Sequence, residues 1–215
     1  MNVLVIGATG GSGRAVCDTL LQRGHAVTAL ARRASVLAPR PGLTPVDADA
    51  TDLAAIERIL PGHDAVVVTL GISESALRVR LRGARNTPDD IRSRATRLVL
   101  DAASRAGIRR IVVQSSYGVG PTRRLPGFLD RLVISLLLRP QFDDTELQER
   151  FVRESGLDWT IVQPVYLTDA DSAEHFVSTD GRIRGRSVSR RGVAQVHAEL
   201  VERPAMIGET VSVSD

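Results

Sequence analysis

Three glycines near the start of the chain are spaced as in a loop that binds phosphate. Gly7, Gly10 and Gly13 follow an apolar, β-branched run over residues 2–6, and an amphipathic helical pattern begins among them. Gly7 would permit a tight turn, Gly10 would let the backbone approach a pyrophosphate, and Gly13 would let the helix pack on the strand. The N–H groups at the helix start would then face the phosphates. The other loop residues expected to contact a dinucleotide are Thr9, Gly11 and Ser12.

The end of the second expected strand favours NADP(H) over NAD(H). NAD-specific folds of this kind place an acidic residue there for the ribose 2′-hydroxyl, whereas this chain has Arg32 and Arg33 after a strand over residues 26–30. Guanidinium groups offer planar, bidentate donors to a 2′-phosphate. The alternative is that these arginines cap a helix start or face solvent, and Arg33 is the better candidate for that role.

All 28 Lys+Arg residues are arginines, because the chain contains no lysine. A P-loop lysine, a Schiff-base lysine and a lysine general base are therefore excluded. The Tyr-x-x-x-Lys pair of most short-chain dehydrogenases is also absent, because Pro121 and Ala170 lie four residues after the two tyrosines, Tyr117 and Tyr166. A reductase built on this chain would protonate its product by another route.

Composition predicts one globular domain over residues 1–215, with a small substrate-side cap at about 165–190. The longest apolar run, residues 132–138, is too short to span a bilayer, and no basic region precedes the first strand as in a signal peptide. The single cysteine, Cys17, excludes an internal disulfide and fits the reducing cytoplasm. The four histidines and this cysteine lack metal-ligand spacing, so no metal is expected.

The net charge of +3 raises the question of nucleic-acid binding. Its best support is a cluster of arginines at positions 78, 80, 82 and 85. The aromatic content of 3% and the absence of a recognised nucleic-acid motif argue against it. We therefore expect a small-molecule acceptor as partner, no nucleic acid or membrane, and a monomer or homodimer.

Strands and helices alternate along the chain, which predicts an α/β fold of the Rossmann type, a doubly wound parallel sheet with helices on both faces. Strands are expected at 2–6, 26–30, 43–46, 65–70, 108–114, 158–163 and 210–213, and helices after the glycine loop and at 52–60, 88–106, 144–154 and 189–203. Residues 121–140 are expected to hold a short helix in a mobile lid. Within the cap, a turn at Asp180-Gly181 is expected to join a strand at 176–178 to Ile183.

With this layout, the whole chain resembles the atypical short-chain dehydrogenases/reductases of the small NAD(P)H-binding, NmrA-like group, close to the biliverdin-IXβ and flavin reductases. The motifs that support the resemblance are Gly7–Gly13, Val46–Asp52, Asp64–Val68, Gln114–Ser116, Ser155–Pro164 and Ser187–Ser189. Family members usually have arginine where this chain has Gln163, and an acidic residue where Arg191 and Gly192 follow Ser189-Arg190. The lysine-dependent mechanism of the related phenylcoumaran and isoflavone reductases is excluded.

The resemblance implies that Asp49 and Ala50 meet the adenine edge and that Leu70 and Gly71 pass beside the pyrophosphate and ribose. Ligands in open α/β sheets bind at the carboxyl ends of the strands. The residues that follow the sixth strand are therefore expected to line the nicotinamide pocket: Pro164, Val165 and Tyr166, the last as a substrate contact. His175, in the cap, is a further candidate substrate contact.

The catalytic candidates follow the fifth strand: Ser115, Ser116 and Tyr117. Ser116 aligns best with the active-site serine of the family that the chain resembles. It could hydrogen-bond an acceptor and help deliver a proton, or it could only satisfy backbone groups at the strand end. Tyr117 is the alternative donor, but no lysine is present to lower its pKa of about 10.

These residues lead to two hypotheses. The first is an NADPH-dependent reductase that transfers hydride to a flat, conjugated acceptor such as a flavin, quinone or tetrapyrrole. The second is a non-catalytic NADP(H)-binding redox sensor that reports to a protein partner.

Overall fold

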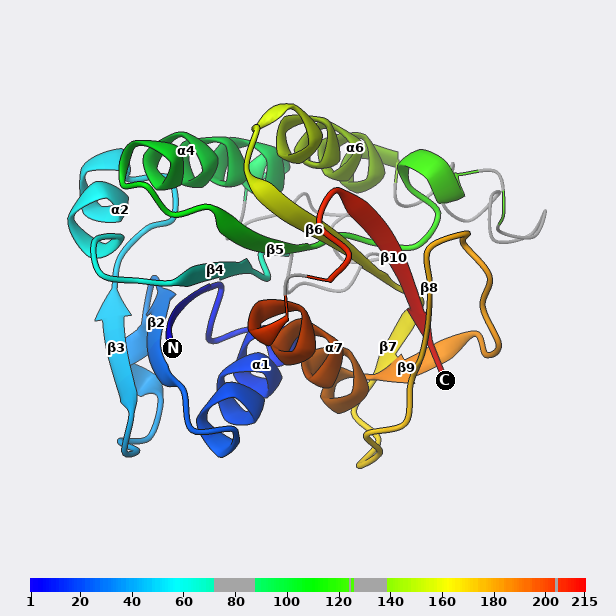
Figure 1. The fold of residues 1–215 in the computed structure, drawn as a ribbon, viewed down its shortest axis with the longest axis horizontal. Helices are drawn as coiled ribbons and strands as arrows, with labels where there is room; N and C mark the ends of the chain where they lie inside the picture. The colour runs from blue at the N-terminus through cyan, green and yellow to red at the C-terminus, as the bar shows by residue number, and fades with distance from the viewer. Residues whose placement is uncertain (72–87, 124, 126–138, 204) are drawn as a thin grey trace.

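An eight-stranded sheet organises the computed structural model, which describes residues 1–71, 88–123, 125, 139–203 and 205–215 (Figure 1). Its strands, in spatial order, are β3 (Leu43–Asp47), β2 (Ala26–Ala31), β1 (Asn2–Ile6), β4 (Ala65–Val68), β5 (Arg110–Gln114), β6 (Asp158–Pro164), β10 (Glu209–Ser214) and β8 (Phe176–Ser178). Every pair from β3 to β10 is parallel, and only β8 runs antiparallel to its neighbour. This order confirms the predicted doubly wound α/β fold.

Helices cover both faces of the sheet (Figure 1). One layer contains α1 (Gly11–Gln22) and α7 (Arg190–Glu202), and the other contains α2 (Leu53–Ile59), α4 (Ile91–Arg105) and α6 (Arg139–Glu154). The side chains of β1 alternate between them: Val3 and Val5 pack in the core on the α1–α7 face, and Leu4 and Ile6 pack in the core on the other. This burial on both faces explains why β1 is a continuous apolar run.

The two helices α1 and α7 run parallel, side by side (Figure 1). At their carboxyl ends, Arg23 donates to Glu202 through Nη1 (2.8 Å) and to Gln195 through Nη2 (2.5 Å). At their amino ends, the side chain of Arg190 lies against Gly11. Both helices therefore begin at the same edge of the sheet.

The segment expected to form a cap is arranged differently from the prediction. Residues 176–178 form the expected strand, β8, and a bend at 179–180 and then Gly181, with a φ of +79°, follow it, but β8 pairs with β10 in the main sheet rather than with residues near Ile183. The physical reason is that β10 would otherwise leave a row of unpaired N–H and C=O groups at the sheet edge. A separate two-stranded sheet joins β7 (Tyr166–Thr168) in parallel to β9 (Ser187–Ser189).

Two expectations fall outside the described residues: the helix within residues 126–138 and the arginine cluster at 78–85. Two short 3₁₀ turns, η1 (Ala34–Val36) and η2 (Gly120–Thr122), follow β2 and β5. Among the described residues, the helices are too short or too polar to cross a lipid bilayer. The domain bounds of 1–215 stay a prediction.

Candidate functional site

The three glycines of the N-terminal loop differ in their surroundings. Gly7 has a φ of +86°, and a Cβ there would lie 2.9 Å from the Thr69 carbonyl oxygen. A Cβ on Gly13 would lie 2.2 Å from the Gly7 carbonyl oxygen, so the first turn of α1 packs directly on the strand end. A Cβ on Gly10 would meet only that same oxygen, at 3.4 Å. The first and third glycines are thus required by the fold, whereas space is left beside Gly10.

That space belongs to a cleft of about 760 Å³ at the carboxyl ends of β1, β2 and β4. The predicted cofactor residues that line it are Gly7, Thr9, Gly10, Arg32, Arg33, Asp49, Ala50, Leu70 and Gly71. The remaining loop residues, Gly11, Ser12 and Gly13, begin α1 beside it. The structure therefore brings the predicted adenine-side and phosphate-side residues together around one cleft.

The cleft is rich in positive charge, part of which the sequence analysis missed. Its lining includes four arginines (Arg14, Arg32, Arg33 and Arg94) and two aspartates (Asp49 and Asp90). Arg14 comes from α1 and donates through Nε to the Thr9 carbonyl (3.0 Å), and Arg94 comes from α4. Arg14 directly follows Gly13 in the chain, a signal that the sequence analysis did not use, whereas Arg94 reaches the cleft only through the placement of α4. Four guanidinium groups against two carboxylates suit an anionic ligand.

Asp49 remains ionised at the adenine side of this cleft. Its carboxylate accepts hydrogen bonds from the backbone N–H and the hydroxyl of Thr51, both at 2.8 Å. These bonds, with smaller contributions from Arg32 and Arg94, hold the pKa of Asp49 below its ordinary value. The carboxylate can therefore accept a hydrogen bond from a bound base.

The exposed side chains of Arg32 and Arg33 stand on a loop fixed by its own hydrogen bonds. Both the backbone N–H and the hydroxyl of Ser35 donate to Asp47 at 2.7 Å, which links η1 to the end of β3. The N–H bond from Ser35 is the main cause that lowers the pKa of Asp47. The two arginines thus lie beside the cleft on a short turn that is hydrogen-bonded to β3.

The hydroxyl of Ser115, a predicted catalytic residue, is directed into a buried polar cluster. It donates to Glu149 of α6, whose side chain is fully buried and also accepts from Gln163 Nε2 (2.6 Å) and Arg153 Nη2 (2.7 Å). Sequence reasoning missed Glu149, which lies 34 residues away on a helix. Gln163 was the available signal, because it stands where members of the family that the chain resembles usually have arginine.

The other two candidates after β5 differ in their hydrogen bonding. The Tyr117 hydroxyl donates to the Gly181 carbonyl (3.0 Å), and burial raises its pKa above the ordinary value. The hydroxyl of Ser116 is half-buried and makes no hydrogen bond to the part of the chain that the structure describes. Of the three predicted donors, Ser116 is the one whose hydroxyl has no hydrogen-bond partner within the described ranges of the chain.

The predicted nicotinamide-side residues lie around the end of β6. The Pro164 carbonyl accepts from the Tyr117 N–H (3.0 Å), which places the two strand ends side by side. Val165 bonds to Val213 of β10, and Tyr166 begins β7 with 77% of its surface exposed. His175 is half-buried beside the first turn of α7, with Nδ1 2.8 Å from the Ala173 carbonyl oxygen.

A row of hydrogen-bonded side chains, from His197 through Gln114, ends at the Ser12 hydroxyl. Gln114 donates through Nε2 to the Ser12 hydroxyl oxygen (3.1 Å), and His197 Nε2 lies 3.3 Å from Gln114 Oε1. Burial lowers the pKa of His197 to about 3, so its ring is neutral and can donate only one hydrogen, here from Nε2. Gln114 then keeps its amide hydrogens toward Ser12, whose own hydroxyl hydrogen is free to point to an anion at the loop.

The burial of neutral His197 predicts a loss of stability in mild acid. Its folded pKa of about 3 lies below the unfolded value of 6.5, so the stabilisation is complete above pH 6.5 and is lost as the pH falls toward 3. Between pH 7 and pH 5, we expect the free energy of unfolding to fall by about 2 kcal/mol more for the wild type than for His197→Gln. Urea denaturation at several pH values measures this difference. Parallel pH profiles for the two proteins would contradict the assignment.

Cys17 lies in α1, where burial raises the pKa of its thiol to about 12. A protonated, buried thiol is a structural side chain rather than a nucleophile. Among the described residues, histidine, cysteine and carboxylate side chains form no group of three or more that could bind a metal ion.

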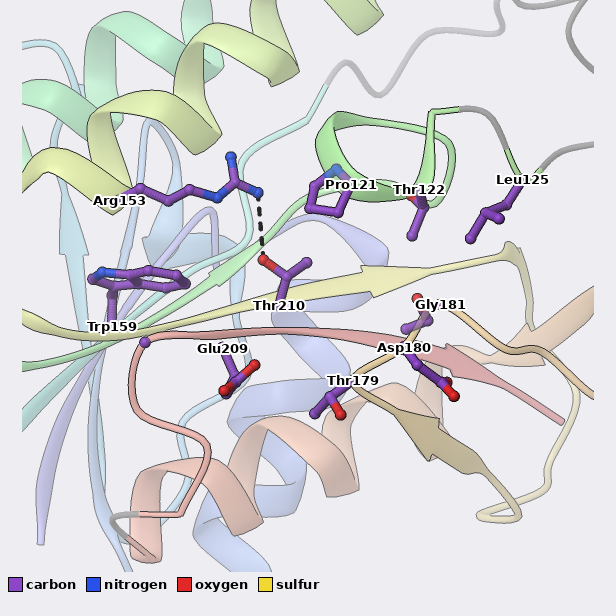
Figure 2. Close-up of a pocket in the computed structure, with 12 residues that line it drawn as sticks. Pro121, Thr122, Leu125, Arg153, Trp159, Thr179, Asp180, Gly181, Glu209 and Thr210 are labelled. Carbon is purple, nitrogen blue, oxygen red and sulfur yellow. Dashed lines mark hydrogen bonds between the residues drawn. The ribbon is translucent and has the colours of Figure 1, made fainter.

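A second cleft, of about 410 Å³, lies on the α6 side of the sheet, between η2, the strands β6 and β10, and the segment 179–181 (Figure 2). Figure 2 shows Trp159 and Thr210 on its floor and Arg153 above them, with a hydrogen bond of 3.3 Å from Arg153 Nη2 to Thr210 Oγ1. No predicted site residue lines this second cleft. The predicted residues gather instead at the carboxyl edge of the sheet.

Comparison with known proteins agrees with this geometry. A protein family described as NAD(P)H-binding matches residues 7–204. Sterol demethylase protein B of Methylococcus capsulatus is 29% identical over 214 residues, 98% of this chain and 56% of that protein. A (4-alkanoyl-5-oxo-2,5-dihydrofuran-3-yl)methyl phosphate reductase of Streptomyces griseus is 35% identical over 164 residues, 75% of this chain and 46% of that protein. The chain spans about half the length of these two relatives.

A solved structure with the same fold is that of ChuY, an anaerobillin reductase from Escherichia coli O157:H7. It superposes with a TM-score of 0.78 at 23% sequence identity, over 100% of this chain and 97% of that chain.

Proposed function

Because this chain belongs to the NAD(P)H-binding family, we propose that it is a reductase that uses NADPH to transfer hydride to a flat, conjugated acceptor. The observation that supports NADPH is the positively charged cleft beside the glycine loop. Arg32 and Arg33 stand at the end of β2, at the point where an NAD-specific site would present a carboxylate to the ribose. Their guanidinium groups suit a 2′-phosphate.

Bound NADPH would supply the hydride and leave as NADP⁺, so that the acceptor gains one hydrogen with its two electrons and then a separate proton. The chain binds the phosphates through the N–H groups that begin α1 and through the Ser12 hydroxyl. Ser116 donates a hydrogen bond to the acceptor as negative charge develops, and passes on a proton that solvent replaces. The Tyr117 hydroxyl already donates to the Gly181 carbonyl, so it is not the donor in this proposal.

The names of related proteins are consistent with such chemistry. The Streptomyces griseus relative is named as a reductase of an oxo-dihydrofuran phosphate, and ChuY is named as an anaerobillin reductase. Both support a search among flat, conjugated carbonyl and tetrapyrrole-like acceptors.

The direct test is steady NADPH oxidation with a panel of flavins, quinones and tetrapyrroles. Turnover with at least one acceptor, faster with NADPH than with NADH, is the expected result. Tight binding of NADP(H) without oxidation of any acceptor would overturn the reductase proposal in favour of a non-catalytic redox sensor.

Arg32→Ala should weaken NADPH binding by about 1.5–3 kcal/mol, the value of one charge-assisted hydrogen bond, and should leave NADH binding nearly unchanged. Titration calorimetry with each cofactor measures the difference. Arg33→Ala is the matched control, with a smaller expected effect because Arg33 is the better candidate for a bystander. An equal loss of NADPH and NADH affinity in Arg32→Ala would remove the 2′-phosphate assignment.

A further inference from the structure

Arg190 lies directly against the glycine loop, at the first position of α7. A Cβ on Gly11 would lie 2.6 Å from Arg190 Nε and 2.9 Å from its Cδ. The absence of a side chain at position 11 therefore creates the space that the arginine occupies. Because Gly11 is the first residue of α1, this guanidinium group lies beside the start of that helix.

The small sheet of β7 and β9 fixes this placement. Its register pairs Thr168 with Ser189, so the residues that follow, Asp169 and Arg190, leave the two strands together. Arg190 Nη1 donates to Asp169 Oδ1 at 2.6 Å. Ser189 caps α7 by accepting from the Gly192 N–H (2.8 Å), which sets where the helix begins. The arginine is thus oriented from both sides.

The ion pair with Asp169 leaves guanidinium N–H donors of Arg190 for a ligand. The carboxylate is 87% exposed and the arginine side chain 29% exposed, so water screens the pair and its net stabilisation is small. Guanidinium has five N–H donors in a planar fork, of which the structure assigns one to Asp169. In addition, α1 has no side-chain cap and no acidic residue in its first turn. Its first N–H groups therefore have no capping side chain as a hydrogen-bond acceptor and can donate to a ligand.

We propose that Arg190 is a cofactor-binding residue that contacts the pyrophosphate of the bound dinucleotide from the α7 side. The inference rests on the proposed NADPH-dependent function and adds a contact common to NADPH and NADH. The pyrophosphate would then lie between the amino end of α1 and one guanidinium group, opposite the arginines that recognise the 2′-phosphate. Asp169 acts as a positioning residue that holds Arg190 extended over Gly11.

The test compares Arg190→Gln with Arg191→Gln. Arg191 is the next residue of the same helix and forms a similar exposed pair with Asp171, whereas the side-chain atoms nearest to a Cβ on Gly11 are those of Arg190, so Arg191 is a matched control. We expect Arg190→Gln to weaken both NADPH and NADH by roughly tenfold to a hundredfold, the value of a charge-assisted contact, and Arg191→Gln to leave both unchanged. Adenosine 2′-monophosphate, which lacks the pyrophosphate, should bind equally to wild type and Arg190→Gln. Circular dichroism melts check that both variants fold.

A double-mutant cycle with Gly11→Ala tests the mechanism. The added methyl group should push the arginine side chain aside, so Gly11→Ala should cost affinity in the wild type and much less in Arg190→Gln. Additive losses, or an Arg190→Gln affinity equal to wild type, would overturn the assignment. So would an equal loss of adenosine 2′-monophosphate binding. A wild-type protein that binds neither dinucleotide would instead overturn the proposed function, and this assignment with it.

Discussion

Replacing Gly10 by valine should abolish the binding of both NADPH and NADH while the protein stays folded. The backbone at this position is extended, and a Cβ would meet only the Gly7 carbonyl oxygen at 3.4 Å, so the fold has room for a side chain. The branched side chain would fill the space through which a pyrophosphate reaches the start of α1. Loss of two or more charge-assisted hydrogen bonds predicts a drop of at least roughly 100-fold in affinity. Equilibrium titration with each cofactor measures it.

Gly13→Ala is the informative companion to this variant. Its Cβ would lie 2.2 Å from a backbone oxygen, so the methyl group must push α1 away from the end of β1. We expect a loss of roughly 1–3 kcal/mol or more in unfolding free energy. Retained cofactor affinity in Gly10→Val, with stability unchanged, would mean that the loop does not hold a dinucleotide.

Ser116→Ala should lower kcat by about 100-fold, the contribution often made by a positioned proton donor, with NADPH affinity intact. Hydride transfer to a neutral acceptor builds negative charge, and Ser116 is the predicted donor whose hydroxyl makes no hydrogen bond to the described residues. The effect should be smaller with easily reduced quinones, whose reduced forms need less help with protonation. Steady-state kinetics with at least two acceptors of different potential measure this.

Two neighbouring variants separate this role from structural effects. Tyr117→Phe removes a hydroxyl that already donates to Gly181, so it should leave most of kcat intact. Ser115→Ala removes a donor to buried Glu149 and should act mainly on stability. The serine assignment fails if Ser116→Ala keeps full rate on every acceptor while Tyr117→Phe loses it. If neither matters, the chain works by orienting its two ligands alone.

Much of the fold and of the cofactor cleft was readable from the sequence, because both depend on local pattern. The apolar run at 2–6, the glycine spacing and the alternation of strands and helices predicted a doubly wound sheet, which the structure confirms. Nine of the predicted cofactor-binding residues between Gly7 and Gly71 line one cleft, because parallel strands present their carboxyl ends at one edge. In this part of the chain, a residue that directly follows a strand can therefore be expected in the cleft.

The parts that sequence reasoning missed depend on contacts between distant segments. Glu149 and His197 reach Ser115 and Gln114 only through the packing of α6 and α7 on the sheet, and nothing near them in the chain marks that role. Strand β8 was assigned to a cap because its pairing partner, β10, lies more than 30 residues further on. Arg190 was hidden for a similar reason, since its neighbour in space is Gly11, at the other end of the chain.

The parallel packing of α1 and α7 has a consequence for how the protein is made. The glycine loop is synthesised some 180 residues before α7, with Arg190 and His197, an interval on the order of ten seconds or more. Until then, the apolar surface that α1 shares with α7 in the folded protein lacks its partner helix. A translation pause before α7 would therefore leave that apolar surface open to aggregation. The glycine loop would gain its contact with Arg190 only when α7 packs beside α1.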